Sequence, residues 1–130
     1  MTMEDPQAAL DVAVTVAIDR AERLPADSSE ARAAYAEVSS IEEALAALHP
    51  AMSVEGAVAR VGAITAALRA SQWARAEALA QRYLSDAQLA AARRAQIEEA
   101  FRTMTPRPVA DLTSLRRHRM SVRSRFQEAA

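Results

Sequence analysis

Residues 28–48 read SSEARAAYAEVSSIEEALAAL, and this stretch decides the fold class of the chain. Apolar side chains recur in it at alternating intervals of four and three residues, at Ala34, Val38, Ile41, Leu45 and Leu48. This spacing places them on one face of an α-helix. The preceding Asp27-Ser28-Ser29-Glu30 is typical of a capping box, and His49-Pro50 marks the end, where a histidine cation favours a helix C-terminus. We therefore predict a helix that buries one apolar face.

A second helix is predicted upstream of this stretch, from Pro6 to about Leu24. Asp5 is a suitable N-cap, and proline is favoured at the first helical position. Residues 12–18 also alternate valine and isoleucine with other residues, which is a strand signal. Helix is preferred because the flanking residues are helix formers and no other segment offers a partner strand. Its two apolar sides predict either a central position or contact with a partner.

Three further helices are predicted downstream. Ser53 is expected to cap a helix whose apolar face carries Val54, Val58, Val61, Thr65 and Leu68. Ser71 is expected to cap a helix over residues 72–84, and Ser85-Asp86 to start one that ends near Met104. Links this short make neighbouring helices run roughly antiparallel.

The composition agrees with an all-α fold that has a thin core. Alanine supplies 33 of the 130 residues, whereas leucine, isoleucine, valine and phenylalanine together supply 25. With only two glycines and 4% aromatic residues, strands and glycine-rich nucleotide loops are disfavoured. We predict a small up-and-down bundle, or stacked helical hairpins, of about five helices over residues 1–105. The prolines of Thr105-Pro106-Arg107-Pro108 then separate this bundle from a second part, residues 106–130, which we predict to form a basic amphipathic helix.

One segment resembles a known family. Residues 66–84 read AALRASQWARAEALAQRYL, with Ser71, Trp73 and Ala76 at the places where a tetratricopeptide repeat carries small and aromatic residues. The resemblance implies a helical hairpin of the kind found in interaction modules. The family's proline after the second helix is absent, and no second copy occurs 34 residues away. No binding residue of the family is therefore carried over.

Catalytic and metal-binding patterns are not found in the sequence. There is no cysteine, and neither His49 nor His118 has a histidine or glutamate three or four residues away. The adjacent carboxylates Glu42-Glu43 and Glu98-Glu99 diverge around a helix, so we expect solvated surface and no acid–base pair. No P-loop or dinucleotide-binding spacing occurs. We predict a protein that is not an enzyme and has no cofactor and no metal.

Neither a membrane span nor a secretory signal is predicted. No apolar run approaches the roughly 20 residues that a membrane-spanning helix requires. The first residues, Met-Thr-Met-Glu-Asp-Pro, are acidic, whereas a secretory signal begins with basic residues. The expected location is therefore the cytoplasm.

Charge divides the chain into two unequal parts. Residues 1–104 hold 10 arginines and 15 acidic residues, a net charge of −5, whereas residues 105–130 hold 6 arginines and 2 acidic residues, a net charge of +4. The basic part also has apolar residues at helical spacing. The residues predicted to bind a partner are Leu112, Leu115, Arg116, Arg117, Arg119, Val122, Arg123 and Phe126, together with Trp73 of the hairpin.

Three kinds of partner are open for this basic segment. It can dock on its own acidic body or on that of a neighbouring copy, on another acidic protein, or on nucleic acid or anionic lipid. The apolar stripe favours the first two, because a purely phosphate-binding arm needs none. The predicted function is a non-enzymatic protein–protein interaction module, an adaptor or assembly subunit that forms homo-oligomers. The alternative is a small nucleic-acid-binding regulator that uses the basic helix.

Overall fold

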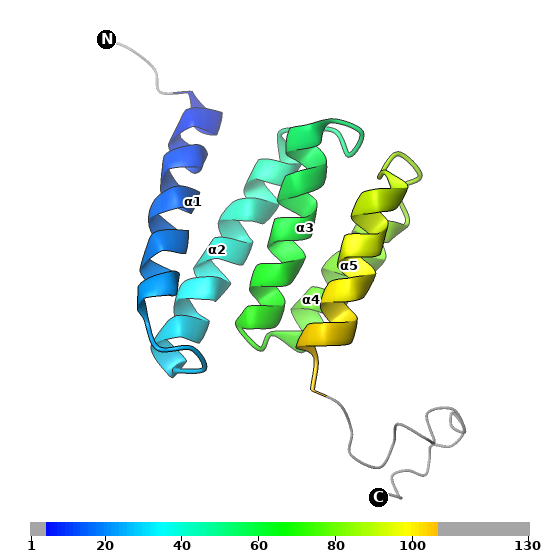
Figure 1. Cartoon of the computed structure of the whole chain (residues 1–130). Coiled ribbons are helices and arrows are strands. Elements are labelled where there is room, and N and C mark those ends of the chain that lie inside the picture. Colours follow the sequence, from blue (N-terminus) through cyan, green and yellow to red (C-terminus); the bar gives the residue numbers. More distant parts are fainter. Residues whose placement is uncertain (1–4, 107–130) are drawn as a thin grey trace, which may run out of the picture.

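The computed structural model of the chain describes residues 5–106, which form five consecutive α-helices (Figure 1). Their bounds are Pro6–Arg23 for α1, Ser29–Ala47 for α2, Val54–Arg69 for α3, Trp73–Leu84 for α4 and Ala91–Met104 for α5. No strand occurs in this part of the chain, so the all-α prediction is confirmed. The alternating residues 12–18 lie within α1, as the helical interpretation required.

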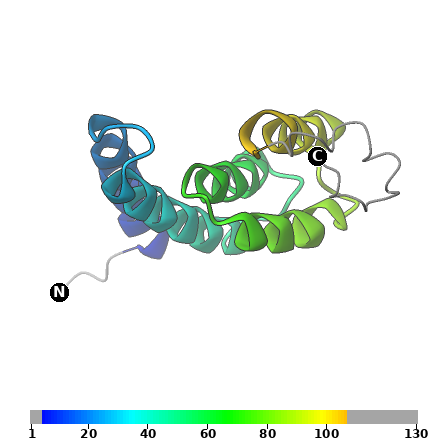
Figure 2. The same ribbon diagram turned by 90° about the horizontal axis from the view of Figure 1, so that it is seen from below.

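The helices form two layers that curve together. Viewed along the helices, α3 and α5 lie on one side, α2 and α4 lie on the other, and α1 slants across the edge beside α2 (Figure 2). Helix α3 packs against α2, α4 and α5, whereas α1 packs mainly against α2. Helix α1 is thus an edge element, not a central one, and Val12 and Val16 on it are exposed. The arrangement corresponds to the stacked helical hairpins predicted from the short links.

Serine side chains form the N-caps of α2 and α3. Ser28 Oγ accepts a hydrogen bond from the backbone N–H of Ala31 at 3.0 Å, and Ser53 Oγ accepts one from Gly56 at 2.9 Å. The predicted capping box of α2 is wrong in detail. The Glu30 carboxylate accepts from the neighbouring Ser29 hydroxyl and does not return to the cap, because Ser28 is the N-cap and Ala31 occupies the third helical position.

The link between α3 and α4 also differs from the prediction. Ser71 has a φ of 59° and ends α3 instead of capping α4. The N–H of Ser71 bonds to Leu68 O at 3.0 Å, and the N–H of Gln72 bonds to Ala67 O at 2.9 Å. This pair of bonds is the Schellman pattern, which satisfies carbonyls at the end of a helix. Gln72 is then the N-cap of α4.

Helix α5 begins later than the sequence indicated. Instead of starting at Ser85-Asp86, it starts at Ala91, after a loop that is held by Arg94. The guanidinium of Arg94 donates hydrogen bonds to the carbonyl of Leu84 at the end of α4 and to those of Asp86 and Leu89 in the loop, at 2.8, 2.7 and 3.1 Å. These bonds replace helical ones for residues 85–90, and Leu89 is buried.

The core is lined by alanine, as the composition predicted. Among the buried alanines of α3 and α4 are Ala57, Ala63, Ala67 and Ala76, each at most 5% exposed. They surround the fully buried Ile64, Leu79 and Ile97. Small side chains allow the helix backbones to approach closely, so α3 turns its alanine face inward. The predicted apolar face of α3 is therefore wrong at its start, because Val54 is 69% exposed and Val58 is 46% exposed.

The described chain ends just after α5. Thr105 is the C-cap of α5, and Pro106 follows it at the predicted linker. The predicted basic helix and its partner-binding residues lie outside the described part of the chain. None of the described helices is long and apolar enough to cross a membrane.

Candidate functional site

A groove runs between α1 and α3, and α2 forms its floor. It encloses about 240 Å³. Helix α1 contributes Ile18 and Glu22, and α2 contributes Tyr35, Val38 and Glu42. The opposite wall consists of Gly62, Thr65, Ala66 and Arg69 of α3. We call this feature the α1–α3 groove.

The floor of the groove is one face of α2. Tyr35, Val38 and Glu42 follow one another at intervals of three and four residues, which places them in line along the helix. Val38 is 4% exposed and packs with Ala17 and Ala66. The floor therefore changes from aromatic to aliphatic to acidic along α2.

The carboxylate of Glu42 lies against the backbone of α3 at Gly62. A Cβ atom placed on Gly62 would be 2.6 Å from Oε2 and 2.8 Å from Cδ of Glu42. Such distances are far below van der Waals contact, so an unmoved Glu42 carboxylate requires glycine at this position. A glycine costs about 1 kcal/mol relative to alanine in a helix interior. Here it makes room for a carboxylate inside the groove.

Glu42 is half-buried and has no cationic partner among residues 5–106. No hydrogen bond or ion pair joins it to an arginine there. Burial raises the pKa of the Glu42 carboxyl to about 7, and repulsion from Asp11 of α1 adds to the increase. The groove therefore holds a carboxylate that is poorly solvated and faces a second negative charge. A cation entering the groove would stabilise the ionised form.

The other end of the groove carries an arginine on an aromatic ring. The Cζ atom of Arg69 lies 5.7 Å from the centre of the Tyr35 ring, within the range of a cation–π contact. A second hollow of about 250 Å³ continues from this point and shares Glu22, Tyr35 and Arg69 with the groove. It extends the groove toward Leu24 and Asp27.

Glu43, next to Glu42 in the sequence, lies in a different environment. It accepts hydrogen bonds from Arg75 at 2.8 Å and from Arg82 at 3.1 Å. The hydrogen bond from Arg75 is the largest cause of the lowered pKa of the Glu43 carboxyl. The expected divergence of Glu42 and Glu43 is thus confirmed, but the expectation that both are solvated is wrong. One lies in the groove, and the other forms ion pairs.

Arg75 links Glu43 to the interior. Its Nε donates to Ser39 Oγ at 3.1 Å, and the Ser39 hydroxyl, which is fully buried, donates to Ala63 O at 2.7 Å. The chain of bonds ties α4 to α2 and α3 on the side of the molecule away from the groove. We therefore assign this cluster to stability.

His49 is not a side-chain cap of α2. Helix α2 ends at Ala47, and the backbone N–H of His49 bonds to Ala46 O at 3.3 Å. Its Nε2 atom is buried and has no hydrogen-bond partner in the described structure. The end of the helix is instead tied to α3 by Arg60, which donates to the carbonyl of His49 at 3.0 Å. Within residues 5–106, no cluster of three or more metal-ligating side chains occurs.

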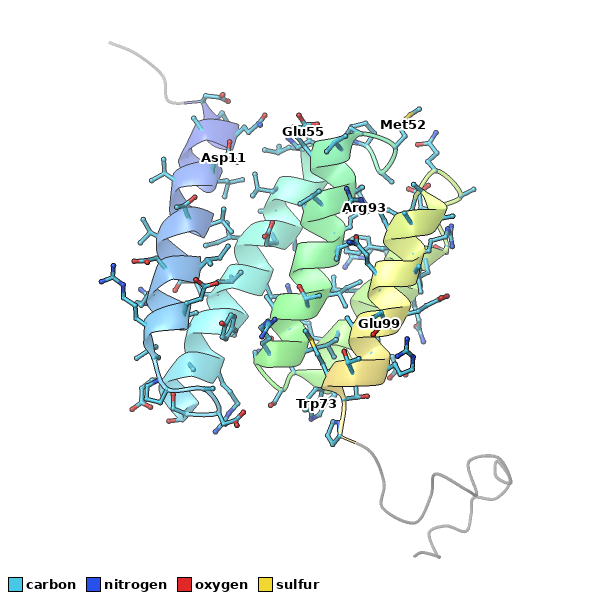
Figure 3. The ribbon with its side chains drawn as sticks, in the orientation of Figure 1. Asp11, Met52, Glu55, Trp73, Arg93 and Glu99 are labelled. Atoms are coloured by element: carbon cyan, nitrogen blue, oxygen red, sulfur yellow. The ribbon has the colours of Figure 1, made fainter. Side chains whose placement is uncertain are left out.

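Of the residues predicted to bind a partner, only Trp73 lies in the described part. It is the first residue of α4, is 38% exposed and lies at the end of the molecule where α5 ends (Figure 3). It does not line the α1–α3 groove. Sequence reasoning missed the groove, although glycine inside a predicted helix is a signal of close approach by another group.

Comparison with protein-family models, with curated proteins and with solved structures finds no match for this chain.

Proposed function

We propose that this chain is a non-enzymatic interaction module whose α1–α3 groove binds an arginine-bearing, amphipathic segment of a protein. The observation that carries the proposal is Glu42, which lies half-buried near Asp11 and has no cationic hydrogen-bond or ion-pair partner among the described residues. An arginine side chain suits this site because its guanidinium can donate two parallel hydrogen bonds to one carboxylate.

The rest of the groove favours an amphipathic partner. Beside the acidic end, the groove is lined by the partly exposed Ile18 and by the buried Val38 and Ala66, all of which are apolar. A helix that carries apolar residues three and four positions apart, with arginine beside them, matches this combination. The groove encloses about 240 Å³, so it is smaller than most sites for drug-sized molecules. Its size therefore favours a polypeptide over a small metabolite.

The experiment is a titration with a synthetic probe peptide. The probe is an amphipathic helical peptide with leucine on one side and arginine on the other, and its control has glutamine at every arginine. Binding to the full chain is measured by calorimetry and located by amide chemical shifts in NMR spectra. We expect the arginine probe to bind and to shift resonances of Val38, Thr65 and Ala66, and the glutamine control to bind much more weakly.

Two variants of the chain test whether Glu42 is responsible. Glu42→Gln removes the charge and keeps the shape, whereas Glu98→Gln changes an exposed carboxylate on α5. We expect Glu42→Gln to weaken binding of the arginine probe by about tenfold or more, since an ion pair that is partly shielded from water is lost. Glu98→Gln should leave binding unchanged. Equal weakening by both variants, or none by either, would contradict the proposal.

A further inference from the structure

We propose that the groove is occupied, in the free protein, by the chain's own arginine-rich segment, residues 107–130. This inference rests on the proposed function of the groove, and it identifies a ligand of the groove within the same chain. The consequence is regulation, because a partner must displace the chain's own segment before it can bind.

Chemical complementarity is the first argument. The segment 107–130 contains six arginines and two acidic residues, whereas the groove and its rim carry Asp11, Glu22 and Glu42 against the single cation Arg69. The segment also has apolar residues at intervals of three and four, among them Leu112 and Leu115. It thus combines the two properties that the groove requires, an apolar stripe and nearby guanidinium groups.

The position of the chain end is the second argument. Helices α1, α3 and α5 all end at the same end of the molecule, and α2 starts there (Figure 1). The described chain therefore stops beside α3, at the end where Glu22, Tyr35 and Arg69 line the groove. Packed helices are about 10 Å apart. Residues 107–111 span roughly 17 Å when extended, enough to pass the end of α3 before the first leucine of the segment.

Length is the third argument. The part of the segment from residue 111 to residue 130 spans about 30 Å as a helix, at roughly 1.5 Å per residue. Helix α3, which forms one wall of the groove, has 16 residues and a length of about 24 Å by the same rule. The segment can therefore run along the whole groove, from the Arg69 end to the Glu42 end.

Tethering favours the chain's own segment over that of a second copy. A segment tethered to its site through a short link reaches an effective concentration in the millimolar range. A second copy at micromolar concentration competes poorly with it. We therefore assign the contact to one chain and treat exchange between two chains as the outcome that the experiment must detect.

Because the natural sequence contains no cysteine, a single introduced cysteine can carry a spin label at one defined position. A Ser124→Cys variant of the full chain carries one nitroxide label, at a position that the helical pattern puts opposite the leucine stripe. In one sample the label and ¹⁵N are on the same chain, which is diluted with unlabelled protein. In the other, labelled and ¹⁵N chains are different molecules. We expect broadening of the Val38, Thr65 and Ala66 amides in the first sample alone, with Glu77 on α4 unaffected.

Two variants make the result specific. Glu42→Gln should abolish the broadening, and so should the triple change Arg116→Gln, Arg117→Gln and Arg119→Gln, which leaves the described helices untouched. The triple variant should also bind the arginine probe peptide about tenfold more tightly than the natural chain, because the groove is then free. Together these results support self-docking.

The opposite outcomes are distinct from a failure of the proposed function. Broadening in the second sample alone would assign the contact to a neighbouring copy and overturn the inference. Absence of broadening in both samples, with normal probe binding that the triple change does not alter, would overturn it as well and leave the groove as a site for other proteins. Absence of both broadening and probe binding would overturn the inference and the proposed function together.

Discussion

The carboxylate of Glu42 occupies the space that a side chain at position 62 would fill, since a Cβ on Gly62 would lie 2.6 Å from Glu42 Oε2. A residue in the middle of α2 and a glycine in the middle of α3 thus form one unit. The glycine weakens its own helix by about 1 kcal/mol and allows a charged group to lie where the two helices meet. The acidic character of the groove depends on this pair.

Gly62→Ala should displace the Glu42 carboxylate without destabilising the fold. The atoms that the new methyl group meets belong to the end of a flexible side chain, and alanine is the better helix former. We expect the free energy of unfolding to stay the same or rise by up to about 1 kcal/mol, measured by urea denaturation. The pKa of Glu42 should fall toward its ordinary value, and binding of the arginine probe should weaken.

The matched control is Gly56→Ala, the other glycine of the same helix. Its Cβ would lie 2.0 Å from the backbone oxygen of Pro50, which cannot move without shifting the α2–α3 link. We expect a loss of about 1–3 kcal/mol from overpacking. Similar losses of unfolding free energy for Gly56→Ala and Gly62→Ala would contradict this prediction, because they would mean that the Glu42 side chain cannot move aside.

Glu42 should also give the protein a distinctive dependence of stability on pH. Its pKa rises from 4.5 in the unfolded chain to about 7 in the folded one, so the folded state binds more protons between these values. The free energy of unfolding should therefore decrease as pH rises from about 4.5 through 7. Asp11 of α1 is the charged group that acts on this carboxyl, and Glu22 of α1 and Arg69 of α3 line the same groove.

The measurement is the difference in the free energy of unfolding between the natural chain and Glu42→Gln. Denaturation at pH 5 and at pH 8 should show the variant gaining stability relative to the natural chain at the higher pH. Asp11→Asn should lower the pKa of Glu42, as read from carboxyl chemical shifts. Glu43 contributes in the opposite sense, because its lowered pKa gives stability that is lost below pH 4.5. If the difference in unfolding free energy between the natural chain and Glu42→Gln stayed constant from pH 5 to pH 8, the raised pKa of Glu42 would be contradicted.

Arg75 should matter more for stability than Arg82, although both bind Glu43. Arg75 also donates to the buried Ser39 hydroxyl and is less exposed, at 30% against 60% for its side chain. We expect Arg75→Gln to cost about 1–3 kcal/mol, because it leaves buried polar groups with fewer partners. Arg82→Gln should cost less than about 1 kcal/mol, as is usual for exposed ion pairs. Thermal and urea denaturation would show equal losses if the buried contact were unimportant.

Two leucines three residues apart, one in α2 and one at its C-cap, offer a test of the packing. Leu45 is 7% exposed and belongs to the core, whereas Leu48 is 46% exposed at the end of the helix. Leu45→Ala should lower the free energy of unfolding by about 2–5 kcal/mol. Leu48→Ala should have an effect of less than about 1 kcal/mol, since little area is buried there. The reverse order in urea denaturation would mean that α2 packs through a different face.

Helix positions followed from the sequence where the signal is local. The 3.6-residue periodicity of α2, the Asp5-Pro6 start of α1 and the Ser53 cap of α3 act through residues within one or two turns. Where a distant group replaced a local bond, the prediction failed. Arg94 holds the loop before α5 by hydrogen bonds that span up to ten residues, and no sequence pattern near Ser85 indicates these bonds.

The buried face of α3 and the position of Glu42 were decided by tertiary structure. Both the valines and the alanines of α3 recur at helical spacing, and the choice between them depends on how closely its neighbours approach. The adjacent Glu42 and Glu43 are alike in sequence, yet Gly62 receives one and Arg75 the other.

The sequence by itself determined that the described chain folds into short antiparallel helices with an alanine core, because helix formation depends on contacts between near neighbours. It also determined the opposite charges of the two parts. Only the tertiary structure decided which carboxylate is shielded from water, because burial depends on residues that lie far apart in the chain.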